Sequence, residues 1–224
     1  MDESKKTYRT LDISERQLLE KSVLDIGAGT DPVVPHAVIF DQAQGDANYI
    51  SRYFETNFDC VYSSHCLEHM ISPESALKEW WQLVKPNGHL FFIVPDEDLY
   101  EQGLFPSRFN GDHKHTFTIA KKKSWSEVSV NVLDLVKTLN DAEVVSVKLN
   151  DIGCDRRYIK HGNYKTGWFA RFLQRQIHSL AKRNIDLFPR GLKNWVYQRC
   201  LVDQTREKAL AQIEVILKKV PSGS

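Results

Sequence analysis

The residues best suited to bind a cofactor follow a short apolar run near the start of the chain. Residues 23–26 (VLDI) predict a buried strand that carries Asp25, and Gly27, Ala28 and Gly29 follow at once. Glycine lets the backbone turn tightly and approach a ligand closely. A strand that runs into such a turn is typical of a cofactor site at the carboxyl edge of a parallel sheet. A purely structural turn explains two glycines equally well, so the residues that follow decide between these interpretations.

Two carboxylates after this turn could hold the sugar and the base of a nucleoside. Asp41 ends a second predicted strand, 38–40 (VIF), where a carboxylate can accept hydrogen bonds from both ribose hydroxyls. Asp46, which is followed by Ala47, could accept a hydrogen bond from an adenine amino group. The alternative for Asp41 is a loop aspartate that caps a backbone turn.

Prolines between these two strands narrow the type of cofactor. Pro32 stands where the dinucleotide-binding motif GxGxxG has its third glycine, which disfavours a nicotinamide dehydrogenase. No GK[ST] follows the turn, which excludes a phosphate-binding P-loop. Pro32 and Pro35 also exclude a long helix here, since each removes a backbone donor. The crossover between the strands is therefore unusually short.

Candidate catalytic residues lie in a long polar and aromatic segment, 95–118, which follows a predicted strand at 90–94. Long loops at this edge of a sheet commonly hold the substrate. His113 or His115 could take a proton from an acceptor hydroxyl or amine, and Asp112 could orient that base. The alternative is that these side chains only hydrogen-bond the loop backbone.

A second group of histidines lies in residues 63–70 (SSHCLEHM), directly after a predicted strand at 58–62. We expect His65 to line the site, and Glu68 and His69 to form a mainly structural corner. The four cysteines of the chain form no CxxC pair, so the sequence predicts no metal site.

Strands and helices alternate around these motifs. Ser72 is a suitable cap for a helix over 73–84, with proline at its first position. This helix joins the predicted strands at 58–62 and 90–94, which indicates a parallel sheet. The sequence therefore predicts an α/β fold with a doubly wound, mostly parallel sheet.

The second half of the chain continues with further predicted elements. Ser124 and Glu127 are spaced as a capping box ahead of a helix at 132–139. Residues 142–149 (AEVVSVKL) then predict a sixth strand. Apolar residues recur at helical spacing over 169–180 and 210–220, which predicts a helical appendage after the sheet.

Length and composition indicate one main domain. The chain has 224 residues, of which 42% are hydrophobic. We expect an N-terminal arm or helix at 1–20, a sheet domain at 21–155 and a helical appendage at 156–224. No apolar run approaches the roughly 20 residues that span a bilayer. The N-terminus has no signal-peptide core, so we expect a cytoplasmic protein.

Charge is distributed unevenly along the chain. Residues 156–199 carry a net charge of +10 and residues 1–155 a net charge of −10. The basic segment is rich in aromatic residues, among them Tyr164, and its cations include Lys182. It could pack on the acidic sheet domain, within one molecule or across a homodimer. It could also bind an anionic membrane surface or a lipid-linked acceptor, or else nucleic acid.

Three stretches together carry a resemblance to a known family: VLDIGAGT (23–30), FDCVYSSHCLEHM (58–70) and LKEWWQLVKPNGHLFFIVP (77–95). With the acid at the end of the second strand, they resemble class I S-adenosylmethionine-dependent methyltransferases. More narrowly, they are similar to the small bacterial "methyltransferase type 11" group, which has a shortened first crossover and an xLEH motif after the fourth strand. The resemblance covers about residues 21–150.

The resemblance implies a Rossmann-like fold, S-adenosylmethionine as cofactor and several site residues. In that family the glycine turn lies against the methionine part of the cofactor. The acid that ends the second strand binds ribose, which corresponds to Asp41, and an Asp-Ala pair meets the adenine, which corresponds to Asp46 and Ala47. The backbone from Ser63 through Ser64 to His65 faces the cofactor.

The sequence as a whole predicts a methyltransferase that aligns an acceptor with the methyl group and excludes water. The family implies a small-molecule or cell-surface sugar acceptor. The histidine cluster supplies candidate bases for methylation at oxygen, and the basic segment suits a lipid-linked acceptor. Two alternatives stay open. One is a cofactor-binding regulatory or scaffold protein without catalysis, and the other is an RNA-binding methyltransferase that uses the basic segment.

Overall fold

The computed structural model describes residues 3–162, 165–181, 183, 185, 187–206 and 208–221. Tyr164 and Lys182 lie outside the described residues. The helices are α1 (Glu3–Thr10), α2 (Ile13–Gln17), α3 (Pro73–Gln82), α4 (Val132–Val136), α5 (Trp168–Ala181) and α6 (Arg190–Tyr197). The strands are β1 (Val23–Ile26), β2 (Val38–Phe40), β3 (Phe58–Ser64), β4 (Val84–Pro95), β5 (Thr116–Thr118), β6 (Ser129–Asn131), β7 (Ala142–Asn150) and β8 (Gln212–Lys219).

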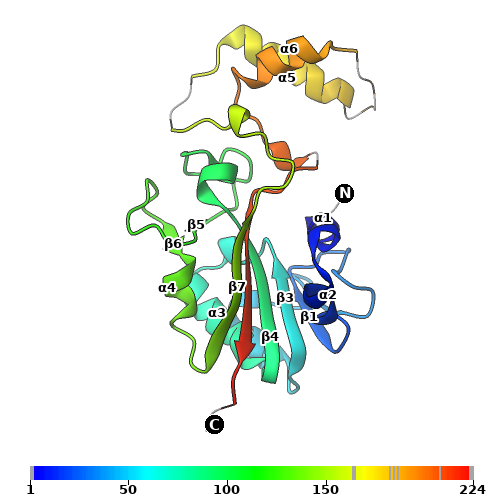
Figure 1. Cartoon of the computed structure of the whole chain (residues 1–224), viewed down its shortest axis with the longest axis vertical. Helices are drawn as coiled ribbons and strands as arrows, with labels where there is room; N and C mark the ends of the chain where they lie inside the picture. Colours follow the sequence, from blue (N-terminus) through cyan, green and yellow to red (C-terminus); the bar gives the residue numbers. More distant parts are fainter. Residues whose placement is uncertain are drawn as a thin grey trace.

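Six of these strands form the central sheet, in the order β2-β1-β3-β4-β8-β7. The pairs β1–β2, β1–β3 and β3–β4 are parallel, and β8 runs antiparallel to both of its neighbours. Figure 1 shows α1 and α2 on one side of the sheet, and α3 and α4 on the other. The predicted doubly wound, mostly parallel α/β fold is confirmed.

Alternating side chains of the strands supply a separate apolar core on each face of the sheet. Leu24 of β1 packs with α3 and α4, whereas Val23 packs with Leu11 and Leu19 near α1 and α2. Because both faces are covered, the central strands read as nearly continuous apolar runs. This layering leaves the carboxyl ends of the parallel strands as the place where loops can build a site.

The last strand corrects a prediction. Residues 210–220 were expected to be helical, but Gln212–Lys219 form β8 between β4 and β7, with Leu217 opposite Leu90. A strand buried on both faces has an apolar run that also satisfies helical spacing, and periodicity alone does not separate the two. The helical segment is therefore an insertion between β7 and β8, and the chain returns to the sheet after it.

The predicted capping box is also wrong. Helix α4 begins at Val132, and its cap is Asn131, whose side chain accepts a hydrogen bond from the Asp134 N–H. The Ser124 hydroxyl donates instead to the buried carboxylate of Glu97, at 2.8 Å. The spacing matched a capping box, but the Ser124 oxygen accepts from the Ser126 N–H at 3.0 Å, and the helix begins only after Asn131.

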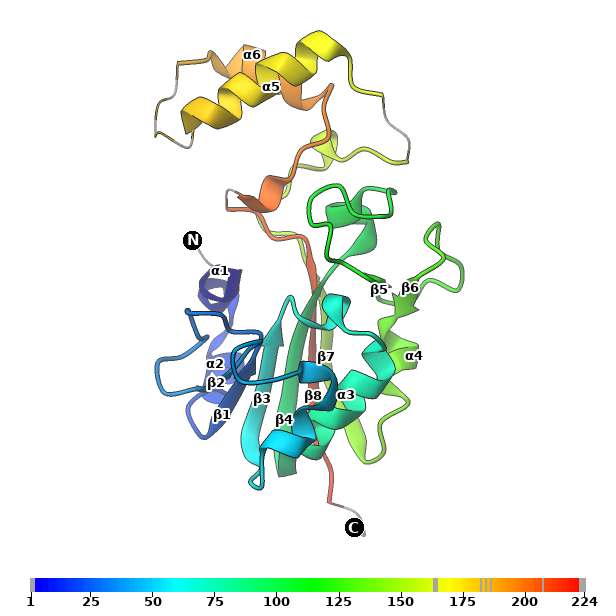
Figure 2. The ribbon, with the colours of Figure 1, turned by 180° about the vertical axis from the view of Figure 1, so that it is seen from behind.

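Helices α5 and α6 lie side by side beyond the end of the sheet where the parallel strands finish (Figures 1 and 2). They share a small apolar core that includes Ile177 of α5 and Val196 of α6. No helix among the described residues is both long enough and apolar enough to cross a membrane.

Candidate active site

A cavity of about 1020 Å³ opens at the carboxyl ends of β1, β2 and β3. It is lined by residue 27, residues 40–42, 45–48, 65–66 and 69–70, and residues 110–114. We call the side formed by Gly27, Asp41, Asp46 and Ala47 the cofactor wall. We call the side formed by His65, His69 and His113 the histidine wall.

The glycine turn shapes the cofactor wall through its backbone. Gly27 has a φ of +81°, and its N–H donates to the Phe40 carbonyl at 2.8 Å. A Cβ at this position would lie 2.8 Å from the Cβ of Cys66, so a larger residue does not fit without movement. The Gly29 N–H donates to Asp41 Oδ2 at 2.7 Å and thereby ties the turn to the end of β2.

The two predicted nucleoside-binding carboxylates both face the cavity. Asp41 Oδ1 accepts from the Gln42 N–H at 2.7 Å. Asp46 Oδ1 accepts from the backbone N–H of Asn48 at 2.9 Å, and hydrogen bonds from Asn48 lower the pKa of Asp46. Each carboxylate oxygen has lone pairs beyond those already used, so both groups can accept further hydrogen bonds from a ligand.

Five other predicted cofactor residues do not line the cavity: Asp25, Ala28, Gly29, Ser63 and Ser64. Asp25 is buried, and its Oδ2 accepts from the Val33 N–H at 2.7 Å. Burial raises the pKa of Asp25 to about 7, although the bond from Val33 acts in the opposite direction. The Ser63 hydroxyl donates to the Ile26 carbonyl at 3.0 Å. Asp25, Gly29 and Ser63 thus hold the turn in place from behind.

The histidine wall centres on His113, which is 7% exposed. Its Nδ1 lies 2.6 Å from Glu101 Oε1, and its Nε2 lies 3.8 Å from Glu68 Oε1. Asp112, which was expected to orient this base, does not do so. Its exposed side chain lies elsewhere in the cavity, while its backbone carbonyl is 3.1 Å from Nδ1 of His69. The orienting carboxylate is Glu101.

The Glu68–His69 corner takes part in the site as well as in the fold. The backbone carbonyl of Glu68 accepts from the N–H groups of Lys114 and His115, which anchors the loop that carries His113. The side chain of Glu68 is fully buried, with His65 Nδ1 3.4 Å from its Oε1. Burial raises the pKa of Glu68, but its three histidine neighbours together outweigh burial, so the net shift is downward.

His65 is placed by an unusual backbone conformation and by a residue far along the chain. Its φ is +54°, in the left-handed region that few non-glycine residues adopt. Its Nε2 lies 3.1 Å from Gln212 Oε1 of β8. His65 lines the cavity, as expected from the sequence. His115 lies outside the cavity, with its Nε2 3.3 Å from the Ile71 carbonyl oxygen.

Comparison with known proteins identifies the chain. A family model described as "Methyltransferase domain" matches residues 5–127, more than half of the sequence. The chain belongs to this methyltransferase family. No curated protein matches the sequence closely enough to count as a relative.

A solved structure supports the methyltransferase fold, and two others give lower scores. A protein assigned as a sarcosine dimethylglycine methyltransferase from Galdieria sulphuraria superposes with a TM-score of 0.52 at 11% identity, over 96% of this chain and 85% of that one. A protein assigned as a methyltransferase from Bacillus halodurans gives 0.47 at 14% identity, over 92% and 98%. Coclaurine N-methyltransferase, bound to N-methylheliamine and SAH, gives 0.46 at 15% identity, over 94% and 72%. The predicted class I S-adenosylmethionine-dependent methyltransferase is confirmed.

The cofactor of the methyltransferase is S-adenosylmethionine, and the cofactor wall suits it. The bare backbone at Gly27 leaves room for close approach, and Asp41 offers acceptors for ribose hydroxyls. Asp46 offers an acceptor for an amino group, with apolar Ala47 beside it. The assignment of each contact to a part of the cofactor stays a prediction.

Sequence reasoning missed two residues of the methyltransferase site, Glu101 and Gln212. Glu101 lies twelve residues before His113 in the same loop, and the only sequence signal was a run of acidic residues at 96–101. Gln212 was hidden because its strand was predicted as a helix. Both residues orient a histidine ring of the site from behind.

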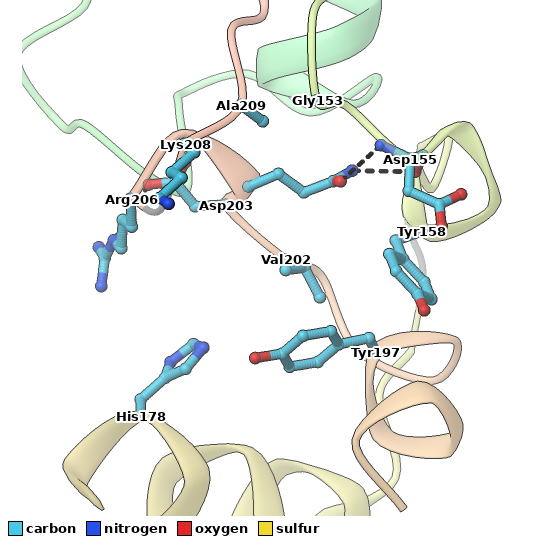
Figure 3. Close-up of a pocket in the computed structure, with 11 residues that line it drawn as sticks. Gly153, Asp155, Tyr158, His178, Tyr197, Val202, Asp203, Arg206, Lys208 and Ala209 are labelled. Carbon is cyan, nitrogen blue, oxygen red and sulfur yellow. Dashed lines mark hydrogen bonds and ion pairs between the residues drawn. The ribbon is translucent and has the colours of Figure 1, made fainter. Parts of the chain in front are cut away.

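The methyltransferase has a second cavity, of about 510 Å³, between the sheet and the α5–α6 pair. Figure 3 shows His178 of α5 and Tyr197 of α6 on one side of it, and Asp155 and Tyr158 on another. It contains none of the predicted site residues and no residue from the ends of the parallel strands. We therefore place the cofactor in the first cavity.

Proposed function

We propose that this methyltransferase methylates an oxygen atom of a small-molecule acceptor, or of a cell-surface sugar or lipid-linked acceptor. The observation that carries the proposal is His113, buried between Glu101 and Glu68 on the wall that faces the cofactor wall residues. Bound S-adenosylmethionine supplies a sulfonium-activated methyl group to an acceptor lone pair. A hydroxyl acceptor must lose a proton during transfer, and a buried histidine beside two carboxylates can promote that loss.

The residues of the chain have separable tasks in this proposal. Gly27, Asp41 and Asp46 hold and orient the cofactor, which removes most of the entropic cost of alignment. Glu101 accepts from His113 Nδ1 and fixes the ring, which leaves Nε2, 3.8 Å from Glu68 Oε1, as the nitrogen that can take a proton. The carboxylate of Glu101 also stabilises positive charge that develops on the imidazole.

The test is a product analysis with several classes of acceptor. The purified protein is incubated with S-adenosylmethionine and panels of hydroxyl, amine and thiol compounds, including sugars and lipid-linked sugars. We expect S-adenosylhomocysteine to form together with a methyl ether, in equal amounts by mass spectrometry. Methylation at nitrogen would contradict the oxygen target. Cofactor binding without any turnover would favour the scaffold alternative.

We also propose that the protein is cytoplasmic and binds an anionic membrane surface through α5. Trp168 is 80% exposed and Phe172 is 51% exposed on this helix. Arg171 and Arg175 are exposed beside them and form no ion pair within the described part of the chain. Aromatic side chains flanked by arginines that pair with no described acid suit a lipid headgroup region.

Vesicle co-sedimentation at physiological salt tests this second proposal. Changing Arg171 and Arg175 to glutamine should reduce binding to anionic vesicles several-fold. Changing Arg156 and Arg157 is a matched control, because these two are already paired with Asp151 and Asp155. Binding to RNA in a gel shift, with none to vesicles, would favour the RNA-binding alternative. Binding to neither would leave packing within or between molecules as the role of the segment.

A further inference from the structure

The strongest unexplained feature of the site is the carboxylate of Glu68. It is fully buried, and neither of its oxygens accepts a hydrogen bond from any described residue. It is the one described carboxylate with both oxygens in that state. The nearest nitrogens are His65 Nδ1 at 3.4 Å and His113 Nε2 at 3.8 Å from its Oε1. A buried carboxylate with no well-formed hydrogen bond is costly, since it has lost its contacts with water.

A second buried glutamate shows what a satisfied site looks like in the same protein. Glu97 is also fully buried. Its oxygens accept hydrogen bonds from the side chains of Thr116, Lys121, Ser124 and Ser129. Glu68 has histidines in place of these donors. A cation between the histidines and Glu68 would supply the favourable contact that hydrogen-bond donors supply to Glu97.

We propose that Glu68, His69 and His113 bind a divalent transition-metal ion at the histidine wall. One potential ligand atom from each of the three lies within 4.8 Å of the other two. A single ion at normal bond lengths needs ligand atoms about 3–3.5 Å apart. His113 Nε2 and Glu68 Oε1 already lie 3.8 Å apart, so small side-chain rotations close the site.

Both histidines are held as metal ligands usually are. A ligating imidazole commonly donates its other N–H to a carboxylate or a backbone carbonyl. His113 Nδ1 meets the carboxylate of Glu101 at 2.6 Å, and His69 Nδ1 meets the backbone carbonyl of Asp112 at 3.1 Å. Donation from each Nδ1 leaves the Nε2 lone pair for an ion.

The ligand set indicates the class of metal. Two imidazoles and one carboxylate suit zinc, manganese, iron, cobalt or nickel better than magnesium or calcium, which prefer oxygen alone. Three protein ligands leave a coordination position open. His69 and His113 line the same cavity as Gly27 and Asp41, so an ion bound to both histidines would lie at the edge of that cavity.

The inference deepens the proposed function and rests on it for the role of the ion. A hydroxyl acceptor in the open position would have its pKa lowered by the cation, and its proton would leave to water. His113 would then act on the acceptor through the ion rather than by taking the proton itself. Metal binding as such does not depend on which acceptor is used.

The direct test measures metal binding by untagged, full-length protein. After chelator treatment, the protein is titrated with ZnCl₂ and MnCl₂ by calorimetry, and bound metal is counted by mass spectrometry after dialysis. We expect one ion per chain. Glu68→Gln and His113→Gln should each weaken binding at least tenfold, and the matched control His115→Gln should leave it unchanged. Cobalt substitution should give an absorption spectrum that the first two variants lose.

Separate readouts distinguish this inference from the proposed function. Cofactor affinity and the thermal melting curve show whether each variant is folded. Absence of a stoichiometric ion, or equal binding by Glu68→Gln, His113→Gln and the control, would overturn the metal site while leaving oxygen methylation intact. One bound ion with full turnover in the metal-free protein would overturn the role of the ion in activation.

Discussion

The cofactor wall and the histidine wall face the same cavity but are held by different interactions. On the cofactor wall, backbone N–H groups of neighbouring residues position carboxylates that remain accessible, as the bond from Gly29 to Asp41 shows. On the histidine wall, buried Glu68 and Glu101 surround His113 with few other polar partners. The first arrangement suits recognition of a polar ligand. The second arrangement keeps the charged carboxylates away from water, where their electric field acts strongly on a reacting group.

His113→Gln should have the largest effect of the variants considered, because it should lower turnover without lowering affinity for the cofactor. If this residue activates the acceptor, turnover should fall about 10²–10⁴-fold. Affinity for S-adenosylmethionine should stay within about twofold, because His113 belongs to the other wall. Steady-state kinetics and calorimetry measure the two quantities on the same preparation. Full turnover in a folded variant would remove His113 from the chemistry.

The second prediction concerns the support behind the cofactor wall. Asp25 is buried, and burial raises its pKa to about 7, above the ordinary value of 3.8. The folded state therefore binds more protons than the unfolded state between these values, and stability must fall as pH rises. From pH 5 to pH 8, we expect Asp25 to lower the free energy of unfolding by about 3 kcal/mol.

Asp25→Asn tests this prediction, since the amide oxygen can still accept from the Val33 N–H but does not ionise. Urea unfolding of both proteins at several pH values gives the difference in stability. The wild type should lose stability relative to the variant as pH rises from about 4 to 7, and the difference should level off above pH 7. A constant difference across that range would show that the Asp25 carboxyl has an ordinary pKa in the folded protein.

The sequence predicts the residues of the cofactor wall better than the residues that position the histidine wall. Asp41 and Asp46 accept hydrogen bonds from the N–H groups of Gln42 and Asn48, one and two residues further on, and Gly27 directly follows a strand, so their types and spacing carry the information. His113 is placed by Glu101 in a loop without regular periodicity, and His65 is placed by Gln212, more than a hundred residues away.

The fold was predictable to a similar degree. The first four sheet strands and α3 follow from apolar runs, glycines and caps. Strand β8 does not, because full burial on both faces removes the alternation that marks a strand. Glu68 was predicted to be structural because nothing local in the sequence indicates that its carboxylate lacks hydrogen-bond donors.

Cofactor binding at Asp41 is measured by calorimetric titration of S-adenosylmethionine and S-adenosylhomocysteine into the wild type and Asp41→Ala. Asp41 lines the cavity and can accept charge-assisted hydrogen bonds from the ribose, worth roughly 1.5–3 kcal/mol each. We expect one site per chain in the wild type and at least a tenfold loss of affinity in the folded variant. No binding by the wild type, or equal affinity in Asp41→Ala, would contradict it.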